Sequence, residues 1–314
     1  MRKTIIVYLF MLMMAMTFCA CGKDKEDKEQ FAHSEDEENN STVVEKSDEN
    51  AIANEDYFTW DNNNYFTGLT EEGKKQKTLI IPKRCEGFGN MGFSNTEIEH
   101  IIFDGSQDVD ISIVFSFMES LVTIQLPSEL THIGVTCFEG CSSLKTISIP
   151  ASVTTIEDYA FARCDSLETV VFEGDNIDKI ASNMFKDCPS LKEIELPDSI
   201  VSIGKYAFEN CEALETIKIP TNVKTIEEEA FFNCSSLSNV ILPEGIDVIE
   251  SNAFGNTAIE ELHLPENINL TNMDVIAFGM NTYDMTVYIV KDSWCDKNQD
   301  IWNAEGMFGE IKYE

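Results

Sequence analysis

The chain has 314 residues, of which 43% are hydrophobic, and a formal net charge of −34. This length and apolar content allow a sizeable buried core. The acidic balance excludes nucleic acids and anionic membrane surfaces as ligands, because both require basic patches on the protein.

Residues 1–21 have the features of an export signal. A positive start at Arg2 and Lys3 precedes an apolar stretch that is too short to span a bilayer. The residues after it resemble the lipobox of bacterial lipoproteins: Phe18-Cys19-Ala20-Cys21-Gly22. This resemblance implies that Cys21 is lipidated and becomes the N-terminus, although Phe and Cys stand where Leu and a small residue are usual. The alternative is simple secretion with cleavage near Ala20.

Residues 22–56 are expected to be disordered. They contain 13 Asp and Glu against 4 Lys, and few apolar residues. Such a segment cannot bury enough surface to offset the entropy lost on ordering. A flexible chain of this length has an end-to-end distance of about 30 Å. We therefore expect a tether that holds the folded part away from a membrane.

From about residue 78 to residue 290 one segment recurs roughly every 23 residues. Prolines mark it at intervals of 23, 47, 23, 23 and 22 residues: Pro127, Pro150, Pro197, Pro220, Pro243 and Pro265. The interval of 47 covers two coils, because Glu173 replaces a proline. A repeat of this length is typical of a solenoid, in which each coil is stable only against its neighbours.

The coils share the pattern Ile-x3-Ala-Phe-x2-Cys-x2-Leu-x2-Ile-x-Ile-Pro, which is complete in residues 201–220. The alternation of apolar and polar residues before the proline predicts a strand with one face inward. The proline ends the strand because it has no amide hydrogen to donate. The pattern resembles the BspA-type (Treponema pallidum-type) leucine-rich repeat of bacterial surface proteins.

The expected fold class is α/β dominated by β-structure, a leucine-rich-repeat solenoid over residues 57–290 with about nine coils. Residues 57–77 are predicted to cap its start and residues 291–314 its end. Strands of successive coils must be parallel, and the return leg, which includes Ile156, is expected to hold short helices or turns. Large aromatic residues on that leg should make the array curve, with the sheet concave. An aromatic binding patch is the alternative to an N-terminal cap: Tyr57, Phe58, Trp60, Tyr65 and Phe66.

Stacking in register places like residues over like. One column is predicted to be buried phenylalanine: Phe93, Phe115, Phe138, Phe161, Phe185, Phe208, Phe231, Phe254 and Phe278. A second column holds five cysteines, with Met118 upstream: Cys141, Cys164, Cys188, Cys211 and Cys234. Buried free thiols are favoured, since Cys behaves as a small hydrophobe. A disulfide between neighbouring coils, which lie about 5 Å apart, is the alternative.

No set of residues for catalysis is evident. The four His are dispersed, and there is no HExxH motif or phosphate-binding glycine loop. An acidic loop at residues 104–110 lacks the Gly and closing Glu of a calcium loop. We therefore expect no enzyme activity, no cofactor and no metal site.

The outward column of the strands is the predicted ligand-binding site. It varies widely between coils, so the fold does not dictate its residues: Gln125, Ser148, Val171, Glu195, Lys218, Ile241, His263 and Tyr288. The alternative is a tolerant solvated sheet. Resemblance to BspA-type proteins implies adhesion to extracellular-matrix proteins or other bacteria. The expected function is recognition of an extracellular protein or glycan by a monomeric, lipid-anchored bacterial surface protein, or else an envelope scaffold without an external ligand.

Overall fold

The computed structural model describes residues 54–89, 93, 96–105, 108–266, 268, 272–273, 277–279, 285–303 and 308–313. These belong to one compact unit, Asn50–Glu314. The predicted export signal with Cys21, and the predicted tether up to residue 53, lie outside the described residues. No helix in the described part is long and apolar enough to cross a membrane.

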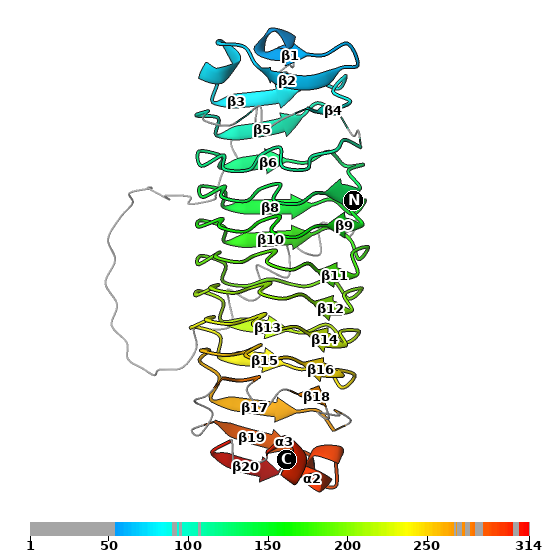
Figure 1. The fold of residues 1–314 in the computed structure, drawn as a ribbon, viewed down its shortest axis with the longest axis vertical. Coiled ribbons are helices and arrows are strands. Elements are labelled where there is room, and N and C mark those ends of the chain that lie inside the picture. The colour runs from blue at the N-terminus through cyan, green and yellow to red at the C-terminus, as the bar shows by residue number, and fades with distance from the viewer. Residues whose placement is uncertain are drawn as a thin grey trace, which may run out of the picture. The chain divides into compact units, whose positions relative to one another are not determined.

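Within this unit the coils stack on one another, and one leg of most coils supplies a strand (Figure 1). These long strands are β3 (Thr78–Ile81), β5 (His100–Phe103), β6 (Thr123–Gln125), β8 (Thr146–Ile149), β10 (Thr169–Phe172), β13 (Thr216–Lys218), β15 (Asn239–Ile241), β17 (Glu261–Leu264) and β19 (Thr286–Ile289). Every pairing between them is parallel and joins equivalent repeat positions, such as Ser148 with Val171. The predicted parallel solenoid is confirmed. Residues 191–197 form no strand. The long strands lie in separate sheets, with further breaks between β6 and β8 and between β15 and β17.

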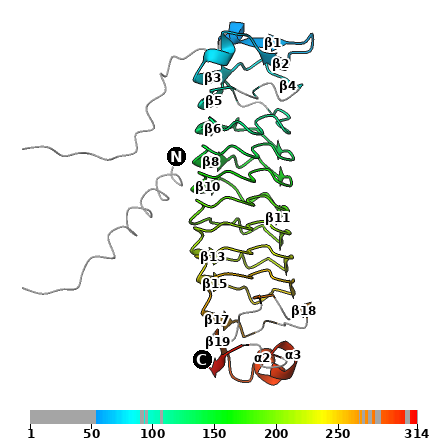
Figure 2. The same cartoon turned by 60° about the vertical axis from the view of Figure 1, so that its left-hand side comes forward.

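The opposite leg is built from turns and two-residue strands. Of the predicted short helices or turns, the described residues of this leg have the turns. Figure 2 shows the long strands on one side of the stack and β11 and β18 on the other. These short strands are β7 (His132–Ile133), β9 (Thr155–Ile156), β11 (Lys179–Ile180), β12 (Ser202–Ile203), β14 (Thr225–Ile226), β16 (Val248–Ile249) and β18 (Asn272–Met273). Their pairing is again parallel. Ile156 therefore lies in a strand.

Hydrogen bonds between coils explain the lack of helix on this leg. The Phe138 N–H donates to the carbonyl of Ala160 in the next coil, and the Phe161 N–H to that of Met184. A helix needs its N–H donors for bonds within its own segment. Because the next coil takes them, no helix forms in the described residues between Gln76 and Ser293.

Two residues with positive φ flank the phenylalanine in each coil from Phe115 to Phe254. Around Phe161 they are Tyr159, with φ 59°, and Arg163, with φ 58°. The leading positions are Ile113, Thr136, Tyr159, Asn183, Tyr206, Glu229 and Asn252. The trailing positions are Phe117, Gly140, Arg163, Asp187, Asn210, Asn233 and Asn256. Left-handed backbone suits Gly, Asn and Asp and strains bulky residues. The fold therefore requires these bends even in coils whose residues are poorly suited to them.

Both ends of the array contribute strands. β1 (Phe58–Trp60) and β2 (Tyr65–Leu69) form an antiparallel hairpin, and β2 pairs with β4 (Gly87–Phe88). Helical turns η1 (Glu55–Tyr57) and η2 (Gly73–Lys75) accompany the hairpin. After residue 290 come α2 (Trp294–Lys297), α3 (Gln299–Trp302) and β20 (Glu310–Tyr313). β20 pairs in parallel with β19, so the last segment extends the sheet.

The phenylalanine column forms the core as predicted. From Phe115 to Phe278 successive ring centroids are 5.0 to 5.6 Å apart, with planes within 21° of each other. All of these rings are buried. Phe93 lies between Phe115 and Phe66 of the hairpin, at centroid distances of 5.5 and 4.7 Å. The column thus continues into the first strands, where Phe58 and Phe66 are buried.

The five cysteines are buried free thiols, and Met118 is buried in the same slot. Each Sγ donates to the carbonyl of the phenylalanine in the preceding coil at 3.1 to 3.2 Å. For Cys188 the acceptor is Phe161. The predicted burial is confirmed. The sequence did not indicate that this column also donates hydrogen bonds to backbone carbonyls. A buried carbonyl without a donor destabilises the folded protein.

Candidate functional site

The predicted binding column lies on the outer side of the long strands. We call it the strand face, and it corresponds to the concave face expected from the sequence. All of its predicted members are exposed except Tyr288, which is half-buried. The sheet register places Lys218 beside Ile241 and His263 beside Tyr288. Glu195 is exposed but lies in the coil that forms no strand.

Two apolar side chains stand out on the strand face. Val171 is 44% exposed and Ile241 55%. Val171 adjoins Ser148, whose hydroxyl donates to Glu173 Oε1 at 2.6 Å. Ile241 lies beside Lys218, so each apolar residue has polar or charged neighbours. Apolar contacts next to hydrogen-bonding groups are the usual composition of a recognition surface.

An aromatic and charged cluster occupies the last coils of the strand face. The rings of His263 and Tyr288 are stacked, with centroids 4.4 Å apart and planes 3° from parallel. Lys312 of β20 lies over the Tyr288 ring, with Nζ 5.6 Å from the centroid. The Tyr288 hydroxyl donates to Glu261 Oε1 at 3.3 Å. The His263 ring and the Lys312 ammonium group therefore both contact the Tyr288 ring.

Sequence reasoning missed Lys312 and Glu261 as partners of Tyr288. Lys312 lies in the segment that is expected to cap the array, and it pairs in register with Tyr288. Glu261 occupies the column two residues before His263 on β17, which faces the same side. The signal that could have found Lys312 is the alternation of apolar and polar residues in residues 310–313.

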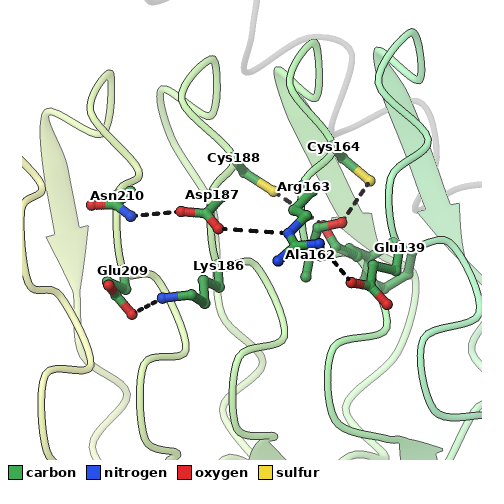
Figure 3. A network of polar contacts seen from close by, with 10 residues as sticks. Glu139, Ala162, Arg163, Cys164, Lys186, Asp187, Cys188, Glu209 and Asn210 are labelled. Atoms are coloured by element: carbon green, nitrogen blue, oxygen red, sulfur yellow. Dashed lines mark hydrogen bonds and ion pairs between the residues drawn. The ribbon is translucent and has the colours of Figure 1, made fainter. Parts of the chain in front are cut away.

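The turn side carries a ladder of polar side chains at the trailing positive-φ positions (Figure 3). The amide Nδ2 of Asn256 donates to Asn233 Oδ1 at 2.5 Å, and that of Asn233 to Asn210 Oδ1 at 2.7 Å. Asn210 donates in turn to Asp187 Oδ1 at 2.5 Å. Arg163 continues the row, with Nε 4.0 Å from Asp187 Oδ2. The Asn spacing of 23 residues was visible in the sequence.

Beside the ladder lie ion pairs between neighbouring coils. Arg163 Nη1 is 3.5 Å from Glu139 Oε1, and Lys186 pairs with Glu209. Each links residues at similar repeat positions on adjacent coils (Figure 3). The ladder and these ion pairs therefore link neighbouring coils along the stack. The Asn and Asp residues of the ladder also suit the left-handed bends, because they tolerate that backbone.

Asp187→Ala is expected to lower the free energy of unfolding by about 2–3 kcal/mol. The substitution removes the acceptor of the Asn210 amide and places Ala in the left-handed region of the backbone. Asp187→Asn is the matched control: it keeps the acceptor and suits the backbone, so we expect a loss below about 1 kcal/mol. Urea unfolding of both variants measures the difference. Equal losses would show that the ladder contributes nothing beyond its charge.

No group of three or more His, Cys, Asp or Glu in the described part of the chain is placed to hold a metal ion. The Nδ1 atom of His100 lies 2.8 Å from Thr123 Oγ1. His132 lies 3.7 Å from a carboxylate oxygen of Glu157. Both are contacts between neighbouring coils.

Residues 71–168 and 154–282 match the family model described as the BspA type leucine rich repeat region, in six copies. The two matches together span more than half of the chain. The chain belongs to the BspA-type leucine-rich-repeat family. This BspA-type protein has no match among curated proteins.

Solved structures with a similar fold include bacterial leucine-rich-repeat proteins. A leucine rich cell surface protein from Faecalibacterium prausnitzii shares 20% identity, with 84% of this chain and 94% of that chain covered and a TM-score of 0.43. The leucine rich repeat protein of T. pallidum shares 23% identity, with 70% and 90% covered and a TM-score of 0.43. A leucine-rich repeat protein from Bacteroides ovatus shares 20% identity, with 82% and 97% covered and a TM-score of 0.35.

Proposed function

We propose that this BspA-type protein is a lipid-anchored bacterial surface protein that binds an extracellular protein or glycan through its strand face. The observations that support the binding site are two in-register groups of side chains on the strand face: Lys218 beside Ile241, and His263 beside Tyr288 and Lys312. All of them are exposed except Tyr288, which is half-buried. The fold does not need exposed Ile241, since other coils place polar residues at that position. The anchor rests on residues 1–21, with Cys21 as the lipidated residue, and on the acidic tether.

The mode of binding follows from the shape of a repeat array. A stack of coils offers many modest contacts along its length in place of one deep pocket. The strand face combines apolar Val171 and Ile241 with charged Glu195 and Lys218. Charged groups at a rim act mainly on association and are screened by salt. Ligand capture should therefore weaken as salt concentration rises.

The test is capture of extracellular-matrix proteins and arrayed glycans by the full chain. Combined replacement of Glu195, Lys218 and Tyr288 by alanine is expected to weaken the captured ligand's affinity at least tenfold. The matched control removes the same residue types from the turn side: Lys205→Ala, Tyr206→Asn and Glu229→Asn. Unchanged capture by the strand-face variant would refute this site. Capture of envelope proteins alone would point to a scaffold.

A further inference from the structure

Four large apolar side chains are exposed on the turn side of three successive coils. Ile113 is 46% exposed, Phe117 51%, Val135 41% and Tyr159 39%. We call them the turn-side patch. Backbone bonds hold these coils side by side: the Phe117 N–H donates to the carbonyl of the next coil's Glu139 at 2.6 Å. The patch thus lies on the leg opposite the strand face and is separate from it.

Three of the four patch residues are in strained backbone. The φ angles of Ile113, Phe117 and Tyr159 are 63°, 56° and 59°. Bulky residues held in this region destabilise the folded state. At the position of Phe117, later coils carry residues that fit the bend and form the ladder: Asp187, Asn210, Asn233 and Asn256. Phe117 therefore destabilises the fold at a position where other coils carry residues that suit the bend.

The Phe117 ring also has a defined place. A Cβ added at Gly140 would lie 2.5 Å from Phe117 Cδ1, so the ring packs over the glycine of the next coil. Gly140 itself has φ 72° and is buried. An aromatic ring that is held in position and half exposed provides contact area at low entropy cost, as an anchor residue at an interface does.

Acidic residues share the turn segments that carry the patch, and we call them the acidic rim. The turn segments 110–119, 134–141 and 157–164 contain five acidic residues: Asp110, Glu119, Glu139, Glu157 and Asp158. Arg163 is the sole Lys or Arg in these segments, and it is paired with Glu139 at 3.5 Å. An apolar surface with an acidic rim is complementary to a polypeptide that combines apolar anchors with Lys or Arg.

We propose that the turn-side patch is a second binding surface, which takes a basic amphipathic polypeptide segment of another protein. Its apolar residues pack on Ile113, Phe117 and Tyr159, and its cationic residues lie against the acidic rim. This goes beyond the proposed function, which uses the strand face, and a protein with both surfaces can link two partners at once.

The test uses the full chain and two labelled peptides with the same amphipathic pattern, one of Leu and Lys and one of Leu and Glu. The variant combines Ile113→Asn, Phe117→Asn and Tyr159→Asn. It keeps every charge and replaces strained residues by one that tolerates left-handed backbone, so it should fold. Fluorescence anisotropy is expected to show at least tenfold weaker binding of the Leu/Lys peptide to this variant, and little binding of the Leu/Glu peptide to either protein.

Tyr206→Asn is the matched control, because Tyr206 occupies the same repeat position in a coil outside the patch. It should bind the Leu/Lys peptide as the wild type does, and so should the strand-face variant, which separates this proposal from the proposed function. Equal binding by the patch variant would show attraction by charge alone and overturn the proposal. A wild-type dimer that the patch variant converts to a monomer would also overturn it, by making a second copy the occupant.

Discussion

Phe185→Ala is expected to lower the free energy of unfolding by about 3–5 kcal/mol. The Phe185 ring is fully buried in the middle of the column, with ring centroids of Phe161 and Phe208 at 5.6 and 5.3 Å. Alanine removes the buried ring and leaves a cavity that two coils cannot close, because each is held by backbone bonds to its neighbours. Interfaces between coils carry the stability of an array, so the loss reaches both sides.

Denaturant unfolding followed by circular dichroism measures this effect. Phe185→Leu is the control, since it keeps a large apolar side chain but removes the stacked ring, and we expect it to cost about 1–2 kcal/mol. A Phe185→Ala loss below that of the leucine variant would show that the column is not the main contribution to the core.

Raising the pH above 9 is expected to destabilise the fold steeply. Burial raises the pKa of the Cys141 and Cys234 thiols from 9.0 to about 12. Burial likewise raises the pKa of Cys164 and Cys211. Between these values the unfolded chain has released protons that the native protein still holds. Since stability falls with pH wherever the native state binds more protons, each such thiol removes about 1.4 kcal/mol per pH unit.

The pH range of this effect follows from the pKa values of the thiols in the unfolded and native states. Below pH 9 the thiols are protonated in both states and this source of pH dependence vanishes; from pH 9 towards 12 it acts in full. Unfolding free energies at pH 8, 9 and 10 measure the slope. The double variant Cys141→Ala and Cys234→Ala is less stable at pH 8, because of its cavities, but should show a slope shallower by about 2–3 kcal/mol per pH unit. Parallel slopes would mean that these thiols ionise freely in the native state.

The sequence alone determined the solenoid, its parallel register, the stacked phenylalanines and the buried cysteines. Each of these depends on a spacing of about 23 residues, which stacking converts directly into contact between like side chains. The outward row of the strand face follows from the same rule, because side chains alternate along a strand. The pairing of Ser148 with Val171 was therefore readable from position in the repeat.

Only the tertiary structure decided the form of the return leg. The two-residue strands and the left-handed bends depend on hydrogen bonds to the next coil. The conformational preferences of the local sequence do not predict these bonds. Tyr159, Arg163 and Glu229 occupy those bends without the Gly or Asn that would have marked them. Lys312 likewise reached Tyr288 through a strand outside the repeat. Spacing specifies which residues meet along the stack, whereas the path of the chain between them is set by neighbouring coils that exist only once the protein has folded.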